Sequence, residues 1–453
     1  MSTNNPTNID ASIDANLRDT ARRAVDLARS LGASEASSVA GRMREVEVQW
    51  RDGRLDKVSE ATTRGLSLQL YADGRYSSVS TSDLRPEALE RFISDAISMT
   101  RALASDEHRR LPDAELYAGR ASLDLALEDP RQAELSAQER QRFARELEEG
   151  ARSVDNKGAI LSVTTGFGDL FRESYRVTSN GFEGGARGTQ FVASAEVSVQ
   201  DPDGRRPEES DSGFARFFED LPAAHVLGRR AGERALGRIG ATKGESAVLP
   251  MVVDHKVSGR LVSMLLGSMS GAALQQKRSF LDGKLGQKVG SDWLTLTDEP
   301  HVKRGLGSRL FDSEGIAARR LPLFEDGVLR SYFIDSYYGR KLQARPTTSS
   351  PSNLMWKLGT KERAGLLADL GEGILVTGFL GGNSSAVTGD YSLGVQGFRV
   401  RGGQRAEPLS EMNISGNQLD LWKRLVAVGQ DPYPYSSART PTLVFEGVQF
   451  AGT

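Results

Sequence analysis

Apolar residues recur at helical spacing in six stretches of the chain. In residues 15–31, Leu17, Ala21, Ala24, Val25 and Ala28 share one face, and Gly32 follows directly. This spacing predicts an amphipathic helix that the glycine ends. The same pattern, with Pro86 and the capping box Ser136–Glu139 as start signals, predicts further helices at 86–104, 136–154, 222–240, 256–274 and 418–428.

Alternating apolar and polar positions predict strands between these helices. Asp73-Gly74 and Asn180-Gly181 stand between alternating runs and are typical of tight turns. After residue 274, turn residues recur about every 8–12 positions, which favours a sandwich or barrel of short strands. Up to residue 253, the predicted strands are 44–51, 65–71, 75–80, 159–167, 171–178, 187–200 and 246–253.

The order of these elements predicts an α+β protein of two domains. Residues 1–14 form a polar tail that we expect to be disordered. Residues 15–240 read as an α/β two-layer domain with hairpins, and 241–453 as a mainly antiparallel, sandwich- or barrel-like β domain. The apolar helix at 256–274 is expected in the core of the second domain. The acidic segment 201–212 is expected to be exposed and to precede the boundary.

Composition excludes several classes of function. A net charge of −2 argues against electrostatic binding of nucleic acid or an anionic membrane. The chain has no cysteine, so disulfides and thiolate metal sites are excluded, and no two of its four histidines lie within one helical turn. The N-terminus has no secretory signal, and the apolar run 261–269 is far shorter than the about 20 residues of a membrane span. We therefore expect a cytoplasmic protein.

Common catalytic motifs are absent as well. The sequence contains no G-x-x-x-x-G-K-[ST], no G-x-G-x-x-G between a strand and a helix, and no G-x-S-x-G. It also lacks H-E-x-x-H. These absences weaken kinase, dehydrogenase, α/β-hydrolase and ordinary zinc-protease interpretations.

Three places could still carry chemistry, and each has a structural alternative. His255 could be a base oriented by Asp254, or Asp254 could simply cap the helix that His255 begins. The glycine-rich stretch 378–403 could be a loop that approaches a peptide and is lined by Thr388, Asp390 and Ser392. It could equally be a hairpin tip whose glycines adopt positive φ. The stretch 415–417 is ambiguous in the same way, as ligand loop or as turn and helix cap.

Several blocks together resemble the TldD/PmbA family of bacterial and archaeal proteins tied to peptide cleavage. The resemblance extends from about residue 15 to 453, although 105–135 carries little of it. Taken together, the blocks are specific for this family, whereas any single block alone would be weak evidence of membership. They are Gly65–Gly74, Phe311–Gly315, Asp326–Leu329, Thr388–Ser392, Gly397–Phe398 and Pro408–Asn417.

The family has two branches, and this chain is similar to the PmbA branch, also called TldE. In the TldD-like branch the apolar helix carries H-E-x-x-x-H and a C-terminal cysteine completes a zinc site, with the glutamate as the expected base. Aligned on its glycines, this chain has Ser263, Met264 and Ser268 at those positions. Serine cannot replace imidazole in a useful zinc site, and methionine cannot act as a base. The resemblance therefore implies no catalytic residue and no metal in this chain.

What the resemblance implies is a non-metal subunit of a zinc metallopeptidase. The partner would be a TldD-like, zinc-bearing subunit in a heterodimer that cleaves unfolded or extended peptides, in modified-peptide maturation or proteolysis. Thr388, Asp390 and Ser392 are the expected substrate-binding residues. Two alternatives stay open: a peptide-binding scaffold or regulator without a hydrolytic role, and an autonomous hydrolase with a Ser/Thr nucleophile in 383–392.

Overall fold

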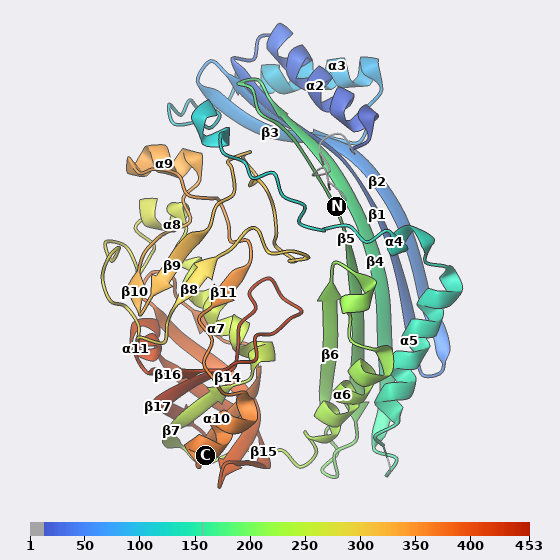
Figure 1. Cartoon of the computed structure of the whole chain (residues 1–453), viewed down its shortest axis with the longest axis vertical. Helices are drawn as coiled ribbons and strands as arrows, with labels where there is room; N and C mark the ends of the chain where they lie inside the picture. The colour runs from blue at the N-terminus through green and yellow to red at the C-terminus, as the bar shows by residue number, and fades with distance from the viewer. Residues whose placement is uncertain (1–12, 156) are drawn as a thin grey trace, which may run out of the picture.

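The computed structural model describes residues 13–155 and 157–453 and shows an α+β architecture (Figure 1). Long, curved strands from the first half form one sheet, and a compact β-rich module from the second half lies beside it. The predicted tail falls almost entirely outside the described residues. The described chain begins with Ile13, which is buried, and Asp14, whose carboxylate accepts a hydrogen bond from the Asn16 N–H.

The first half forms a six-stranded antiparallel sheet in the order β3-β2-β1-β4-β5-β6. Helices α2 and α3 cover one end of the long strands, and α5 and α6 the other (Figure 1). Each end therefore has its own apolar core. The strands are β1 (Glu35–Arg51), β2 (Arg54–Ala72), β3 (Arg75–Thr81), β4 (Ile160–Thr178), β5 (Glu183–Val199) and β6 (Glu208–Ala215).

The helices of the first half confirm the predictions from apolar spacing and capping. All five residues predicted for the inner face of the first helix are buried. The capping box at Ser136 and Glu139 is formed in both directions. Helices α5 and α6 pack so closely that a Cβ at Gly228 would lie 1.9 Å from the Leu147 carbonyl oxygen. The helices are α2 (Ala15–Ser30), α3 (Pro86–Thr100), η1 (Ala114–Tyr117), α4 (Arg131–Glu134), α5 (Ala137–Arg152), η2 (Phe218–Asp220) and α6 (Ala224–Leu236).

Two predictions for the first half are wrong. The expected strands 159–167 and 171–178 are one strand, because Gly168 stays paired with Glu47 on one side and Val192 on the other. The segment 201–212 is not simply exposed: Asp201 and Asp211 are buried, since the segment's last residues enter β6 and pair with β5.

The second half is built around a closed barrel. Strands follow the order β12-β7-β17-β15-β14, and β14 pairs back with β12, which closes five strands. The barrel strands are β7 (Ala247–Val253), β12 (Gly373–Phe379), β14 (Asp390–Arg401), β15 (Gln404–Asn417) and β17 (Leu443–Ala451). Short β13 (Asn383–Ser384) and β16 (Leu425–Val428) extend it at β14 and β17. The barrel-like expectation is thus confirmed.

A second, smaller sheet and several short helices complete this module. The sheet has the order β10-β9-β8-β11 and shares an apolar core with the barrel and with helix α7 (His255–Gly267). Its strands are β8 (Leu296–Asp298), β9 (Leu321–Glu325), β10 (Val328–Leu329) and β11 (Leu354–Trp356). The helices are α7 (His255–Gly267), α8 (Gly271–Gln275), α9 (Ser336–Leu342), α10 (Arg363–Leu370) and α11 (Gln418–Lys423).

Two predicted helices of the second half are too long. The stretch 256–274 breaks into α7 and α8, because Ser270 forms a bridge with Phe333 and caps the second helix. The stretch 418–428 is helical only as far as Lys423, since Leu425–Val428 pairs with β17. Within the part of the chain that the structure describes, no helix combines the length and hydropathy needed to cross a bilayer.

Candidate functional site

Helix α7 begins at a densely bonded corner. Asp254 is 2 % exposed, accepts a hydrogen bond from the Lys256 N–H at 2.9 Å and pairs with the Arg363 guanidinium. Burial by itself raises the pKa of Asp254, but Arg363 and the Lys256 N–H outweigh it and hold the pKa below its usual value. The helix cap considered for Asp254 is thus present.

His255 sits beside this cap rather than in a catalytic array. Its Nδ1 lies 2.7 Å from the Asp431 carbonyl oxygen, and its ring packs against Tyr433 with centroids 5.5 Å apart. A base needs a nucleophile within hydrogen-bond reach. Among the described residues, no serine, threonine or tyrosine hydroxyl forms a hydrogen bond with the His255 imidazole; the Ser258 hydroxyl donates to the His255 backbone carbonyl instead. The geometry favours a positioning contact between α7 and the 431–435 segment.

The second half of α7 carries side chains with no metal-binding character. The Ser263 hydroxyl is exposed and donates to the Gly259 carbonyl at 2.8 Å, whereas Met264 packs against the core. Ser268 is fully buried and its hydroxyl donates to the Leu265 carbonyl at 2.7 Å. These groups do not fit a zinc ion, which binds imidazole, thiolate or carboxylate. In residues 13–155 and 157–453, no cluster of three His, Cys, Asp or Glu side chains is placed to hold a metal.

The predicted substrate-binding residues gather at the β13–β14 end of the barrel. Thr388, Asp390 and Ser392 are all exposed. The Asn417 amide donates to the Thr388 carbonyl at 2.9 Å and to Asp390 Oδ1 at 3.0 Å. Hydrogen bonds from Thr388 and Asn417 lower the pKa of Asp390. Asn417 also caps α11 through the Leu419 N–H, so the turn-and-cap reading of 415–417 holds for its last residue.

This corner adjoins the end of α7. The Ser279 hydroxyl donates to the Ser268 carbonyl at 2.6 Å, and the next N–H, of Phe280, donates to the Ala386 carbonyl at 2.9 Å. One short segment therefore connects the glycine-rich loop with the helix end that the family resemblance singles out. Hydroxyls and one carboxylate line the loop. In the described chain, none of the hydrogen bonds of Ser384, Ser385, Thr388 or Ser392 involves a histidine.

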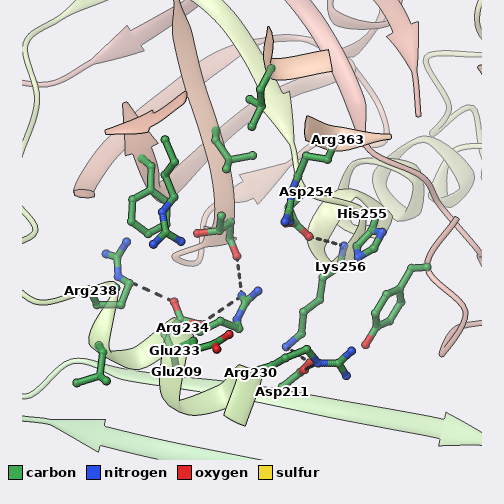
Figure 2. A pocket seen from close by; sticks show the side chains of 18 of the residues that line it. Glu209, Asp211, Arg230, Glu233, Arg234, Arg238, Asp254, His255, Lys256 and Arg363 are labelled. Carbon is green, nitrogen blue, oxygen red and sulfur yellow. Dashed lines mark hydrogen bonds and ion pairs between the residues drawn. The ribbon is translucent and has the colours of Figure 1, made fainter. Parts of the chain in front are cut away.

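A larger cavity, which the sequence reasoning missed, lies between the two halves of the chain (Figure 2). It has a volume of about 1040 Å³. Arg230, Arg234 and Arg238 line one wall at four-residue spacing, along and just beyond α6. Asp254, His255 and Lys256, at the start of α7, line the opposite wall. The arginine spacing was visible in the sequence, but only the tertiary fold places α7 opposite it.

Carboxylates of β6 neutralise most of these cations. Asp211 lies 2.7 Å from both the Arg230 guanidinium and the Lys256 ammonium, and Glu209 lies 3.4 Å from Arg234. Burial lowers the pKa of Lys256 despite the attraction of Asp211. Because Lys256 comes from the second half and Asp211 from the first, this network ties the two halves together.

Comparisons with known proteins agree with one another over most of the chain. Family models described as PmbA/TldA metallopeptidase domain 1, central domain and C-terminal domain match residues 39–100, 130–239 and 246–452. A metalloprotease PmbA from Escherichia coli O157:H7 is 30% identical over 443 residues, which is 96% of either chain.

Solved structures have the same fold. A Bacteroides thetaiotaomicron protein, described as a candidate modulator of DNA gyrase, is 41% identical with a TM-score of 0.94, covering 97% of this chain and all of its own. TldE from Thermococcus kodakarensis superposes with a TM-score of 0.84 at 19% identity, covering 96% of this chain and 100% of its own. At that identity the likeness concerns the fold.

Proposed function

This chain belongs to the PmbA/TldA metallopeptidase family, and we propose that within it the chain is a TldE-like subunit that contributes no metal ligand to a zinc peptidase. Its partner in this proposal is a TldD-like, zinc-bearing subunit, and its substrates are unfolded or extended peptides. The proposal includes a cytoplasmic location, as expected from the cysteine-free sequence.

The observation that carries the proposal is the chemistry of α7. Ser263, Met264 and Ser268 offer two hydroxyls and a thioether, and both hydroxyls already donate to carbonyls of their own helix. A zinc-bound water needs nitrogen, sulfur or carboxylate ligands and a base that takes its proton. All of these groups must therefore come from the partner.

The part assigned to this chain is to hold substrate near the partner's metal. Asp390 and Ser392 lie on β14, whose neighbour β13 is a two-residue strand at the end of the sheet order. An extended peptide can pair with a strand edge through its backbone, which requires little sequence specificity. Asp390, ionised at neutral pH, suits an amide or ammonium of the peptide.

Reconstitution tests this proposal. Peptidase activity on an unstructured peptide is measured for this chain, for a TldD-like partner and for their mixture, each with and without a chelator. We expect activity in the mixture alone and its loss on chelation. Activity of this chain alone that survives chelation would revive the Ser/Thr nucleophile in 383–392 and refute the proposal.

Two variants separate substrate holding from a passive scaffold. In the mixture, Asp390→Ala and Ser392→Ala should raise KM with little change in kcat, because they remove contacts made equally in the ground and transition states. Arg54→Met, at an exposed position at the start of β2, is the matched control and should change neither constant. Unchanged KM in both loop variants would favour the scaffold.

A further inference from the structure

Another cavity, open on one side to solvent, lies where the linker between the first two family domains crosses the end of the sheet. The linker, residues 101–129, is the stretch that the family models leave uncovered. With β1, β2, β3, β4, the Ser313–Glu314 loop and the start of α9 it surrounds a volume of about 310 Å³. Figure 1 shows the linker running between β3 and α9. Ligand pockets span about 300–1,000 Å³, so this one suits a small molecule.

One guanidinium in this cavity has no counterion among the described residues. Arg176, on β4, donates from Nη1 to the Ser37 hydroxyl at 3.1 Å and makes no ion pair with a described carboxylate. Burial lowers the pKa of Arg176, while Asp312 and Glu314 act on it only from a distance. A guanidinium has five N–H donors, so several of its hydrogen-bonding positions are available to a ligand.

A second guanidinium is fixed in place beside the same space. Arg109 lies between two tyrosine rings, with its Cζ 3.6 Å from the Tyr337 centroid and 4.6 Å from that of Tyr76. It forms no ion pair with any carboxylate of the described chain. A stacked guanidinium is pre-organised, so it loses little side-chain entropy when it binds a planar anion.

The linker is held firmly on both sides of Arg109. The Tyr337 hydroxyl donates to Asp106 at 2.7 Å. Arg340, from α9, donates to the carbonyls of His108 at 2.8 Å and Arg110 at 2.7 Å. The second half of the chain therefore fixes the backbone that presents Arg109, and the cavity is a built feature rather than a gap under a loose segment.

The acidic side chains of the cavity are already engaged. Both oxygens of Glu314 accept hydrogen bonds from Ser336, and burial raises the pKa of Glu314. Asp335 accepts from the Tyr338 N–H at 2.7 Å as the cap of α9. These carboxyls leave Arg109 and Arg176 unpaired, whereas the third arginine of the lining, Arg110, pairs with Asp113 at 3.6 Å. The carboxyls would repel a dianion more strongly than a monoanion.

From this arrangement we propose that the linker cavity binds a small monocarboxylate, whose oxygens accept hydrogen bonds from Arg176 and Arg109. Planar carboxylates match the guanidinium fork in a bidentate geometry. The site shares no lining residue with α7 or the 383–392 loop, and the inference does not depend on the proposed function.

The test uses N-acetylglycine as the probe, with saturation-transfer NMR on the full-length protein at constant ionic strength. We expect saturable binding with a Kd of about 1 mM or below, and at least about tenfold weaker binding of N-acetylglycinamide, which lacks the carboxylate. Inorganic phosphate should displace the probe only at higher concentrations than N-acetylglycine itself. Absence of binding, equal binding of the amide, or displacement by less phosphate would overturn the assignment.

Substitutions of the two arginines test whether N-acetylglycine binds in the linker cavity. Arg176→Met and Arg109→Met should each weaken N-acetylglycine binding about tenfold or more, while Arg54→Met should bind as the wild type does. Arg109 is partly exposed, so its variant decides the question should the Arg176 variant fail to fold. Wild-type affinity in the folded Arg109 variant would show that the probe binds elsewhere.

Discussion

The two ends of helix α7 differ sharply in chemistry although only about three turns separate them. At its start, Asp254 and Lys256 are charged and held by Arg363 and Asp211. Towards its end, Ser263 and Ser268 carry neutral hydroxyls that bond to the helix itself. These charged side chains lie at the start of α7, where the two halves of the molecule meet. The end of α7 has none, although this is where the family resemblance locates a catalytic metal in the TldD-like branch.

This difference separates two roles for one helix. The first turn joins the barrel to the long sheet through Asp211, which reaches both Arg230 and Lys256. The later turns fill the apolar core with residues such as Leu261 and Leu265 and present no reactive group. The helix is therefore an assembly element in this chain, and variants at its two ends should have different consequences.

The largest effect is expected from Asp211→Asn. The change leaves Arg230 and the partly buried Lys256 without their carboxylate, which should lower the free energy of unfolding by about 3 kcal/mol. Chemical denaturation measures it. The control is Glu219→Gln, which removes a carboxylate that also faces the other half, through Arg304, but is 67% exposed. That control should cost less than about 1 kcal/mol, and an equal loss in both variants would contradict a special role for Asp211.

Asp254→Ala should have the next largest effect, about 2 kcal/mol, because it removes both the helix cap and the charge. Asp254→Asn keeps an oxygen that can cap the helix and removes only the negative charge, so it measures the contribution of that charge to stability. Since the folded-state pKa of Asp254 lies below its ordinary value of 3.8, the charge stabilises the protein above that pH, and the benefit is lost as the pH falls through the folded-state pKa. Denaturation series from neutral to acidic pH should show wild type and Asp254→Asn converging, and a constant gap would refute this assignment.

Lys256→Met is expected to be nearly neutral, within about 1 kcal/mol at pH 7, because Asp211 keeps Arg230 as its partner. The pKa of Lys256 is lowered, so the unfolded chain binds more protons between the folded-state pKa and 10.5. The stability of the wild type relative to Lys256→Met should therefore rise as the pH rises through that range. A relative stability that falls with pH would mean that attraction to Asp211 outweighs burial.

The smallest effects should come from the far end of the helix. Ser263→Ala and Met264→Leu should each leave the peptidase activity of the reconstituted mixture within about twofold, because neither side chain is assigned a catalytic role. Parallel kinetic assays with matched subunit concentrations provide the measurement. A loss of tenfold or more with normal stability would show that this face of α7 takes part in the reaction.

Local signals in the sequence predicted much of the fold. The inner face of α2, the capping box of α5 and the turn at Asp73-Gly74 depend on neighbouring residues alone, and all are present. Features set by distant pairing were missed. Gly168 stays within β4 because β1 and β5 flank it, and α7 ends before α8 because Ser270 bridges to Phe333.

The candidate sites likewise divide into one that local sequence signals indicated and others that depend on contacts between distant segments. Glycine spacing and polar residues drew attention to 383–392, and the structure places Thr388, Asp390 and Ser392 at one exposed corner. Their binding of peptide stays a prediction. The cavity between the halves and the linker cavity escaped notice, because each combines side chains from segments more than a hundred residues apart.

Zinc analysis of the separate subunits tests the proposal that this chain supplies no metal site. Each purified subunit is equilibrated with zinc, freed of unbound metal by gel filtration and analysed by mass spectrometry for bound zinc. We expect about one zinc per TldD-like partner and less than about 0.1 per copy of this chain. One tightly bound zinc per copy of this chain, with peptidase activity that depends on it, would show that this chain carries the metal site.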